Sequence, residues 1–208
     1  PDVGDWVEYS NVGHSVLIVR TASGVKAYHN ACRHRGVPIA GGYGNDAGKV
    51  ASGNCAKSGF VCPFHGWRFG LDGANIEVVD PADWGKCLKP GETDLTHIQV
   101  GMWGGWVWIN LDPAAEPLLD YLEPAAGMLD PFQLQNMRPR WRNWTVFDCN
   151  WKVALEAFNE TYHVPGTHPE FMEFGSFPGW ARNHGLHSNI GYDAPKGMDE
   201  NREGIIEI

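Results

Sequence analysis

The chain has 208 residues, 43% of them apolar, and a formal net charge of −9 at pH 7. This length and apolar content suffice for one large domain or two modest ones. The negative charge argues against nucleic acid and against an anionic membrane surface as partners. No apolar run approaches the roughly 20 residues that a membrane-spanning helix needs, and no signal segment opens the chain.

The five cysteines do not indicate a disulfide framework in a chain of this size. Metal-bound thiolates in a reducing compartment fit better, so we expect a cytoplasmic protein. The sequence reads as a strand within a few residues of Pro1, which indicates a fragment of a longer protein.

Residues 3–112 are expected to form a compact all-β module of short strands separated by Gly and Asn turns. Three hairpins are predicted, with turns at Ser23-Gly24, Asp72-Gly73 and Gly104-Gly105. Residues 41–59 are rich in Gly, Asn, Ser and Lys and are expected to form a loop or a flexible hairpin.

Residues 113–131 are predicted to be a linker, and residues 132–208 to begin a second domain. Within it, residues 140–147 resemble a strand. Asp148 or Asn150 can cap a helix that begins near Trp151. This helix is expected to end at about His163, because Pro165 and Gly166 follow. No regular element is predicted for residues 171–208.

Two Cys/His pairs have metal-ligand spacing, Cys32-x-His34 and Cys62-x-x-His65. Each pair lies in a turn between predicted strands, so two thiolates and two imidazoles can converge. Zinc accepts such ligands in a tetrahedral site. A 2Fe–2S cluster with two Cys on one iron and two His on the other is the second interpretation.

The string from Cys62 to Trp67, Cys-Pro-Phe-His-Gly-Trp, together with Cys32-x-His34, resembles the Rieske cluster-binding signature of ring-hydroxylating oxygenases and their ferredoxins. The resemblance favours the cluster over zinc and gives Trp67 a packing role beside it. Twenty-seven residues separate His34 from Cys62, more than is usual in the family, and the extra length falls in a surface loop. The remaining cysteines have no paired His and are expected to be ordinary: Cys55, Cys87 and Cys149.

A second metal signal is formed by Glu156, Glu160 and His163, which a continuous helix places within about 60° of one another. Two carboxylates four residues apart repel, and a bound metal would offset that cost. His168 follows a Pro-Gly turn that can fold it back towards the same metal. The alternative is a solvated acidic face with an incidental His.

The run from Asn150 through His163 to His168 resembles the catalytic-domain motif of the same oxygenase family, carboxylate-x3-carboxylate-x2-His-x4-His. The resemblance implies that His163 and His168 bind a mononuclear iron, with a carboxylate as third ligand. In the family this carboxylate lies far downstream. We assign the role to neither Asp193 nor Asp199, and expect most of the catalytic domain to be absent from this chain.

Glu160 matches a family position usually held by Asp. The resemblance implies that Glu160 is an electron bridge between subunits, linking His163 to His65 of a neighbouring chain. Glu156 is expected to support the site without binding the metal. The other histidines are treated as ordinary, with two of them expected to line the substrate pocket: His14, His29, His97, His184 and His187, the last two being the pocket candidates.

The predicted fold class is α+β, with an antiparallel all-β Rieske domain followed by the beginning of an α+β, helix-grip-like catalytic domain. The resemblance implies an oxygenase large subunit. Electrons from NAD(P)H, carried by a ferredoxin or a flavin reductase, pass from a 2Fe–2S cluster to mononuclear Fe(II). There O2 is activated for dihydroxylation, monooxygenation or demethylation of an organic substrate, aromatic or apolar. A homotrimer is implied, with or without a small β subunit.

Two other classes of function stay open. A Rieske-type electron carrier would need only residues 3–112. A zinc-stabilised binding module would explain the four Cys and His ligands. Neither function explains why the chain contains the second motif, with Glu160, His163 and His168.

Overall fold

The computed structural model describes residues 2–11, 13–41, 50–173 and 179–191. The chain divides into two compact units, residues 1–122 and residues 123–208. The predicted linker, residues 113–131, contains two short helices, α1 (Leu118–Leu122) and α2 (Ala125–Leu129), which belong to different units. None of the helices formed by the described residues is long and apolar enough to cross a membrane.

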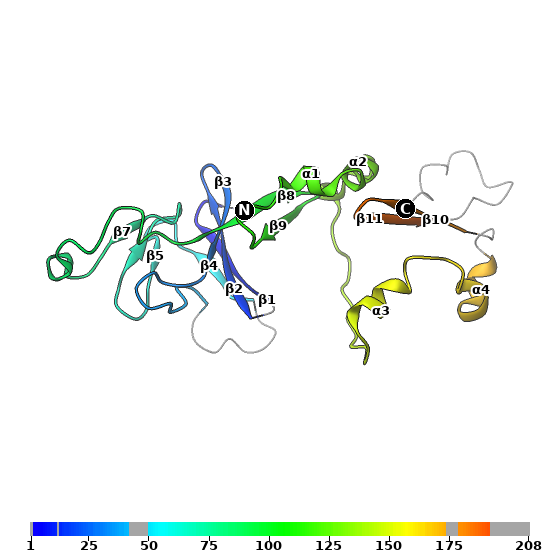
Figure 1. The fold of residues 1–208 in the computed structure, drawn as a ribbon, viewed down its shortest axis with the longest axis horizontal. Helices are drawn as coiled ribbons and strands as arrows, with labels where there is room; N and C mark the ends of the chain where they lie inside the picture. The colour runs from blue at the N-terminus through cyan, green and yellow to red at the C-terminus, as the bar shows by residue number, and fades with distance from the viewer. Residues whose placement is uncertain (1, 12, 42–49, 174–178, 192–208) are drawn as a thin grey trace. The chain divides into compact units, whose positions relative to one another are not determined.

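The first unit contains a six-stranded antiparallel sheet of order β4-β1-β2-β3-β8-β9 and a three-stranded antiparallel sheet of order β5-β6-β7 (Figure 1). The strands are β1 Asp5–Asn11, β2 His14–Thr21, β3 Gly24–His29, β4 Ser52–Asn54, β5 Phe60–Val61, β6 Arg68–Phe69, β7 Asn75–Glu77, β8 His97–Trp103 and β9 Trp106–Asn110. A 3-10 helix, η1 (Pro81–Trp84), follows β7. The antiparallel, strand-rich character predicted for this part of the chain is confirmed.

The three predicted hairpins are confirmed. Strands β2 and β3 pair around Ala22-Ser23, one residue before the predicted turn, β6 and β7 around Asp72-Gly73, and β8 and β9 around Gly104-Gly105. In the segment predicted to be a loop, β4 pairs with β1. Residues 42–49 of that segment lie outside the described residues.

The core of the first unit joins the two sheets. Tyr28 of β3 and Phe69 of β6 are fully buried in one cluster, and Cys32, Cys62 and Trp67 belong to the same cluster. The Tyr28 hydroxyl donates a hydrogen bond to the Leu71 carbonyl at 3.1 Å, tying the large sheet to the small one. The two cysteines predicted to hold metal are therefore anchored in a packed core, whereas His34 is half-buried and His65 is exposed.

The second unit contains short elements. They are α2, η2 (Asp130–Phe132), η3 (Leu134–Asn136), α3 (Trp151–Glu156), α4 (Val164–Thr167), η4 (Pro169–Glu173) and a hairpin of β10 (Trp180–His184) and β11 (His187–Gly191). The predicted cap of α3 is confirmed, because the Asn150 side chain accepts a hydrogen bond from the Lys152 N–H at 3.0 Å.

The predicted helix from Trp151 to His163 is wrong beyond Glu156. The chain turns after α3, and the Glu160 carboxylate accepts the His163 backbone N–H at 3.1 Å. In a continuous helix that N–H would bond to the carbonyl of Asn159. Asn159 and Thr161 favour such local turns over helix, so the helix stops and α4 starts only at Val164.

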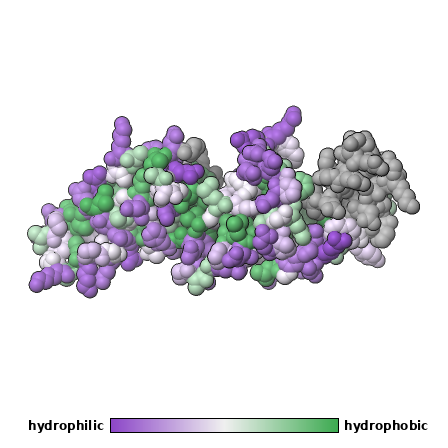
Figure 2. Space-filling model, turned by 90° about the horizontal axis from the view of Figure 1, so that it is seen from above, coloured by the Kyte–Doolittle hydropathy of each residue, from purple (hydrophilic) through white to green (hydrophobic). Residues whose placement is uncertain are grey.

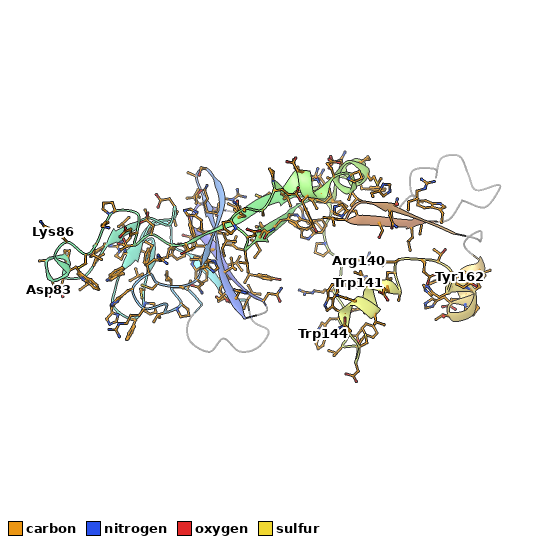
Figure 3. The ribbon with its side chains drawn as sticks, viewed as in Figure 1. Asp83, Lys86, Arg140, Trp141, Trp144 and Tyr162 are labelled. Carbon is orange, nitrogen blue, oxygen red and sulfur yellow. The ribbon has the colours of Figure 1, made fainter. Side chains whose placement is uncertain are left out.

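The strand predicted for residues 140–147 is also wrong in this structure. This segment is extended but pairs with no strand among the described residues. Its aromatic side chains are exposed, Trp141 to 73% and Trp144 to 82%, and Figure 3 shows both on the segment before α3. A strand pattern needs a neighbouring strand to satisfy its N–H groups, and the hairpin of this unit does not supply one.

The β10–β11 hairpin was not predicted. Its two-residue turn is Gly185-Leu186, and Gly185 has a φ of 66°. A Gly-x pair between alternating residues is a hairpin signal that the sequence contains.

On the face drawn in Figure 2, hydrophobic residues reach the surface between hydrophilic ones.

Candidate metal centres

The two Cys/His loops of the first unit share one backbone pattern. The Cys32 N–H donates to the Val37 carbonyl, and the Cys32 carbonyl accepts the Gly36 N–H, both at 2.8 Å. The Cys62 N–H likewise donates to the Trp67 carbonyl at 2.8 Å, and its carbonyl accepts the Gly66 N–H at 3.0 Å. Each loop thus closes on a glycine four residues after its cysteine.

Gly36 and Gly66 have φ values of 71° and 74°, in the left-handed region that favours glycine. This conformation lets each loop turn back within a few residues. The two cysteines therefore occupy equivalent positions, whereas His34 follows its cysteine by two residues and His65 by three.

The two cysteines face each other in the core. Cys32 and Cys62 are both buried and belong to one core cluster. Burial raises the pKa of Cys32, and the contact with Cys62 raises it further. Two adjacent buried thiols are costly to ionise unless a metal compensates their charge.

The two histidines form a second pair. The rings of His34 and His65 lie 4.6 Å apart between centroids. His34 is stacked on Trp67 at 5.1 Å with an interplanar angle of 13°. Burial lowers the pKa of His34, as do the charges of His65 and Arg35, which favours the neutral imidazole that a metal requires.

An unpartnered atom points to a missing ligand at this pair. The Nδ1 atom of His34 is buried and has no hydrogen-bond partner among the described residues. Buried polar atoms in folded proteins are satisfied in the great majority of cases. A metal bound to Nδ1 would satisfy this one.

The candidate ligands form one pair of cysteines and one pair of imidazoles. A single tetrahedral zinc needs all four ligands around one point. A 2Fe–2S cluster with separate Cys and His irons needs two pairs, which is what these loops supply.

Asn30 holds the first loop in place. Its side chain is buried and makes four hydrogen bonds: Oδ1 accepts the N–H groups of Ile39 and Ala40, and Nδ2 donates to the Ala40 carbonyl and to Ser15 Oγ. Cys32 and His34 lie between Asn30 and the anchored residues Ile39 and Ala40. The amide therefore closes the loop at its base.

In the second unit, Glu160 and His163 are in direct contact. Glu160 Oε1 lies 2.7 Å from His163 Nδ1, and Oε2 accepts the His163 backbone N–H at 3.1 Å. These bonds from His163 hold the pKa of Glu160 below its usual range. An ionised carboxylate can only accept, so Nδ1 donates the proton of this hydrogen bond, and in the neutral imidazole the lone pair is then on Nε2.

His168 lies beside this pair. The His163 and His168 rings are 5.7 Å apart between centroids, and His168 Nδ1 is 3.6 Å from Glu170 Oε1. Helix α4, with Pro165 in its first turn, brings His168 back towards His163. Both imidazoles thus have a carboxylate near Nδ1, an arrangement common for metal-binding histidines.

Other predicted members of this site are not brought together. Glu156 ends α3 exposed, and its side chain makes no hydrogen bond or ion pair with the described residues. Asp193 and Asp199 lie outside the described residues. A third iron ligand stays unassigned.

A cavity of about 470 Å³ adjoins the turn after α3. Both predicted pocket histidines, His184 and His187, line it, together with Phe158, Asn159 and Arg182. The guanidinium of Arg182 lies 4.4 Å from the Trp180 ring, and His184 Nε2 is 3.1 Å from Asn189 Oδ1.

Cys55, Cys87 and Cys149 are free thiols, and Cys55 belongs to the same core cluster as Cys32 and Cys62. Cys55 is buried, its thiol donates to the Gly4 carbonyl at 3.5 Å, and burial raises its pKa to about 11. Cys87 and Cys149 are exposed.

Comparison with known protein families gives one match in each of the two units of the chain. Residues 2–87 match the Rieske [2Fe-2S] domain, and residues 131–202 match the catalytic domain of ring-hydroxylating alpha subunits. The chain therefore combines an iron–sulfur domain with part of an oxygenase domain.

Individual relatives are of the same kind. The chain is 30% identical over 174 residues to the glycine betaine monooxygenase oxygenase subunit of Pseudomonas aeruginosa, covering 83% of this chain and 38% of that protein. It is 32% identical over 184 residues to the large oxygenase component of the naphthalene 1,2-dioxygenase system of Pseudomonas putida, covering 84% and 38%. The structure of a quaternary ammonium Rieske monooxygenase superposes with a TM-score of 0.72 at 25% identity, covering 93% of this chain and 51% of that one.

The chain belongs to the large subunits of the Rieske non-haem iron oxygenases. It spans about 38% of the length of these curated relatives. The predicted α+β class, with an antiparallel iron–sulfur domain first, is confirmed.

Proposed function

We propose that this chain is part of an oxygenase large subunit that uses O2 to hydroxylate, dihydroxylate or demethylate an organic substrate. The observation that carries the proposal is the pairing in the first unit: two thiols are buried in one core cluster, and two imidazoles, one with an unpartnered Nδ1, form a second pair. When bound, a 2Fe–2S cluster and a mononuclear Fe(II) supply one-electron storage and O2 activation.

Cys32, His34, Cys62 and His65 would hold the cluster. The core packing of the two thiols and the stacking of His34 on Trp67 support this assignment. Trp67 then stacks on His34 and fixes the plane of its ring. His65 is the more exposed of the two imidazoles and is the candidate for contact with another subunit.

His163 and His168 would hold the mononuclear iron through Nε2. Glu160 orients His163 by accepting its ring proton, and α4 orients His168. We assign Glu160 the role of bridge towards His65 of a second copy. The similar quaternary ammonium monooxygenase structure is described in terms of inter-subunit electron transfer, which supports such a bridge. A homotrimer, with or without a small subunit, would provide it.

The wider setting follows from the family. Electrons would come from NAD(P)H through a ferredoxin or a flavin reductase, in the cytoplasm. Residues 3–112 would be the electron-entry domain, residues 113–131 the linker, and residues 132–208 the start of the catalytic domain. The relatives act on substrates as different as glycine betaine and naphthalene, so the family does not restrict the substrate to an aromatic compound.

Two other functions are less well supported. A pure electron carrier does not need a segment that matches an oxygenase catalytic domain. A zinc module does not explain why residues 2–87 match the Rieske [2Fe-2S] domain.

The experiment uses the full-length protein loaded with ferrous iron under anaerobic conditions. Nitric oxide is added, and EPR spectra are recorded for a high-spin ferrous nitrosyl signal. The proposal expects this signal in the wild type, its loss in His163→Ala and His168→Ala, and its retention in the control variant His187→Ala. A signal that survives both ligand substitutions would contradict the assignment of the iron site. Incorporation of ¹⁸O from ¹⁸O2 into glycine betaine or naphthalene would then identify the substrate type.

A further inference from the structure

A loop outside both Cys/His motifs closes over the histidine pair. Residues 79–84 follow β7 and end in η1, and Val79, Asp80, Asp83 and Trp84 line a surface depression together with His34, His65 and Trp67. Figure 3 labels Asp83 in this loop and Lys86, which lies just after it in the chain. The depression contains Asp80 and Asp83 but not Lys86.

Trp84 packs directly on the proposed ligand environment. Its ring meets that of His34 edge-on at 5.3 Å and that of Trp67 at 5.5 Å, with interplanar angles of 84° and 71°. Its Nε1–H donates to the Val79 carbonyl at 3.4 Å, which pins the ring within the loop. Trp84 therefore removes water from one side of His34.

We propose that this loop lowers the reduction potential of the cluster held by the four Cys and His residues, an inference that rests on the proposed function. With two thiolates and two neutral imidazoles, a diferric 2Fe–2S cluster is neutral, and uptake of one electron makes it anionic. Asp80 and Asp83 oppose that added negative charge, and Trp84 withholds the water that would stabilise it. Charge and solvent exposure are recognised determinants of such potentials.

Positive charge acts in the opposite direction on the same cluster. Arg35 is exposed and directly follows His34 in the chain. Its removal is expected to lower the potential, whereas removal of either aspartate raises it. This difference in sign separates an electrostatic effect from general damage to the fold.

The test is a redox titration of the full-length protein, followed by the visible absorption and EPR signal of the cluster. Asp80→Asn, Asp83→Asn, their double variant and Trp84→Ala should each raise the midpoint potential. For the double variant we expect a change of about tenfold in the equilibrium for electron uptake, or about 59 mV for a one-electron couple. Asn also tolerates the left-handed φ of 49° that Asp80 adopts, so the loop should keep its shape.

Controls make the result specific. Asp120→Asn removes an equal charge from α1, outside the depression, and should leave the potential unchanged. Arg35→Gln should lower it, and Trp84→Phe should shift it less than Trp84→Ala. Added salt should shrink the effect of the Asp variants but not that of Trp84→Ala.

Potentials of the double variant and of Trp84→Ala at or below the wild-type value would overturn the inference. Absence of acid-labile sulfide and of the cluster's EPR signal from the wild type would instead overturn the proposed function itself.

Discussion

Replacing Asn30 with alanine tests whether a single buried amide holds the first cluster loop. Asn30 is 4% exposed, and its four hydrogen bonds join residues before and after Cys32 and His34. Alanine removes all of them at once. The N–H groups of Ile39 and Ala40 and the Ala40 carbonyl then lose their partners inside the fold.

The cost follows from the groups left behind. A buried donor or acceptor without a partner costs about 1–3 kcal/mol, and the cavity left by the amide can admit a water that recovers part of this. For the two N–H groups we therefore expect the loop to be destabilised by about 2–4 kcal/mol. Since every 1.4 kcal/mol is a factor of ten, protection against amide exchange should fall roughly 30- to 700-fold.

The assay is hydrogen–deuterium exchange with mass spectrometry on peptides that span residues 30–41. Asn54→Ala is the matched control, because Asn54 also makes side-chain hydrogen bonds, to Val3, Asp5 and Ala56, but is exposed. Water replaces those bonds, so exchange in the 30–41 peptide should stay near wild type. Protection of that peptide within about threefold of wild type in Asn30→Ala would refute the reasoning.

Three further predictions concern the second site and pH. His163→Ala in the full-length protein should abolish oxygenation and leave the cluster's visible absorption intact; loss of the colour as well would mean that the two sites are not separate. Glu160→Gln should keep both metals but slow product formation severely, because the side chain keeps an oxygen acceptor for His163 and loses its charge; near-normal turnover would remove Glu160 from the mechanism. Hydrogen bonds from the Asn54 side chain, the largest cause, and from the Asp2 backbone N–H help to lower the pKa of Asp5 to about 2, below its unfolded value, so this carboxylate stabilises the fold above about pH 4, and the stabilisation is lost as the pH falls towards 2. In Asn54→Ala the Asp5 carboxyl should titrate closer to its usual pKa, which carbon-detected NMR measures directly; an unshifted titration would show that Asn54 is not the cause.

The sequence predicted the first unit well because its signals are local. Turn pairs such as Asp72-Gly73 specify hairpins within a few residues, and the Cys and His residues lie in loops that such hairpins position. The sequence could not show that Asn30 closes the first loop or that Trp84 covers His34. Both depend on contacts between segments separated in the chain, and neither residue belongs to a recognisable motif.

The second unit was harder to predict because a helical spacing of residues competes there with local hydrogen bonds from side chains to the backbone. The spacing of Glu156, Glu160 and His163 fits a helix, yet the Glu160 carboxylate takes the N–H that would have continued it. Glu160 and His163 are still brought together, by a turn in place of a helical face, while Glu156 is not. The Gly185 turn signal was present but stood within a segment without other strand features.

The central claim is that the chain supplies the ligands for a Rieske cluster and two ligands of a mononuclear iron. Iron and acid-labile sulfide should be determined per chain on anaerobically purified full-length protein, with an EPR spectrum after dithionite reduction. The account predicts about three irons and two sulfides, and the low average g value of a His-ligated cluster. Zinc without sulfide would contradict it.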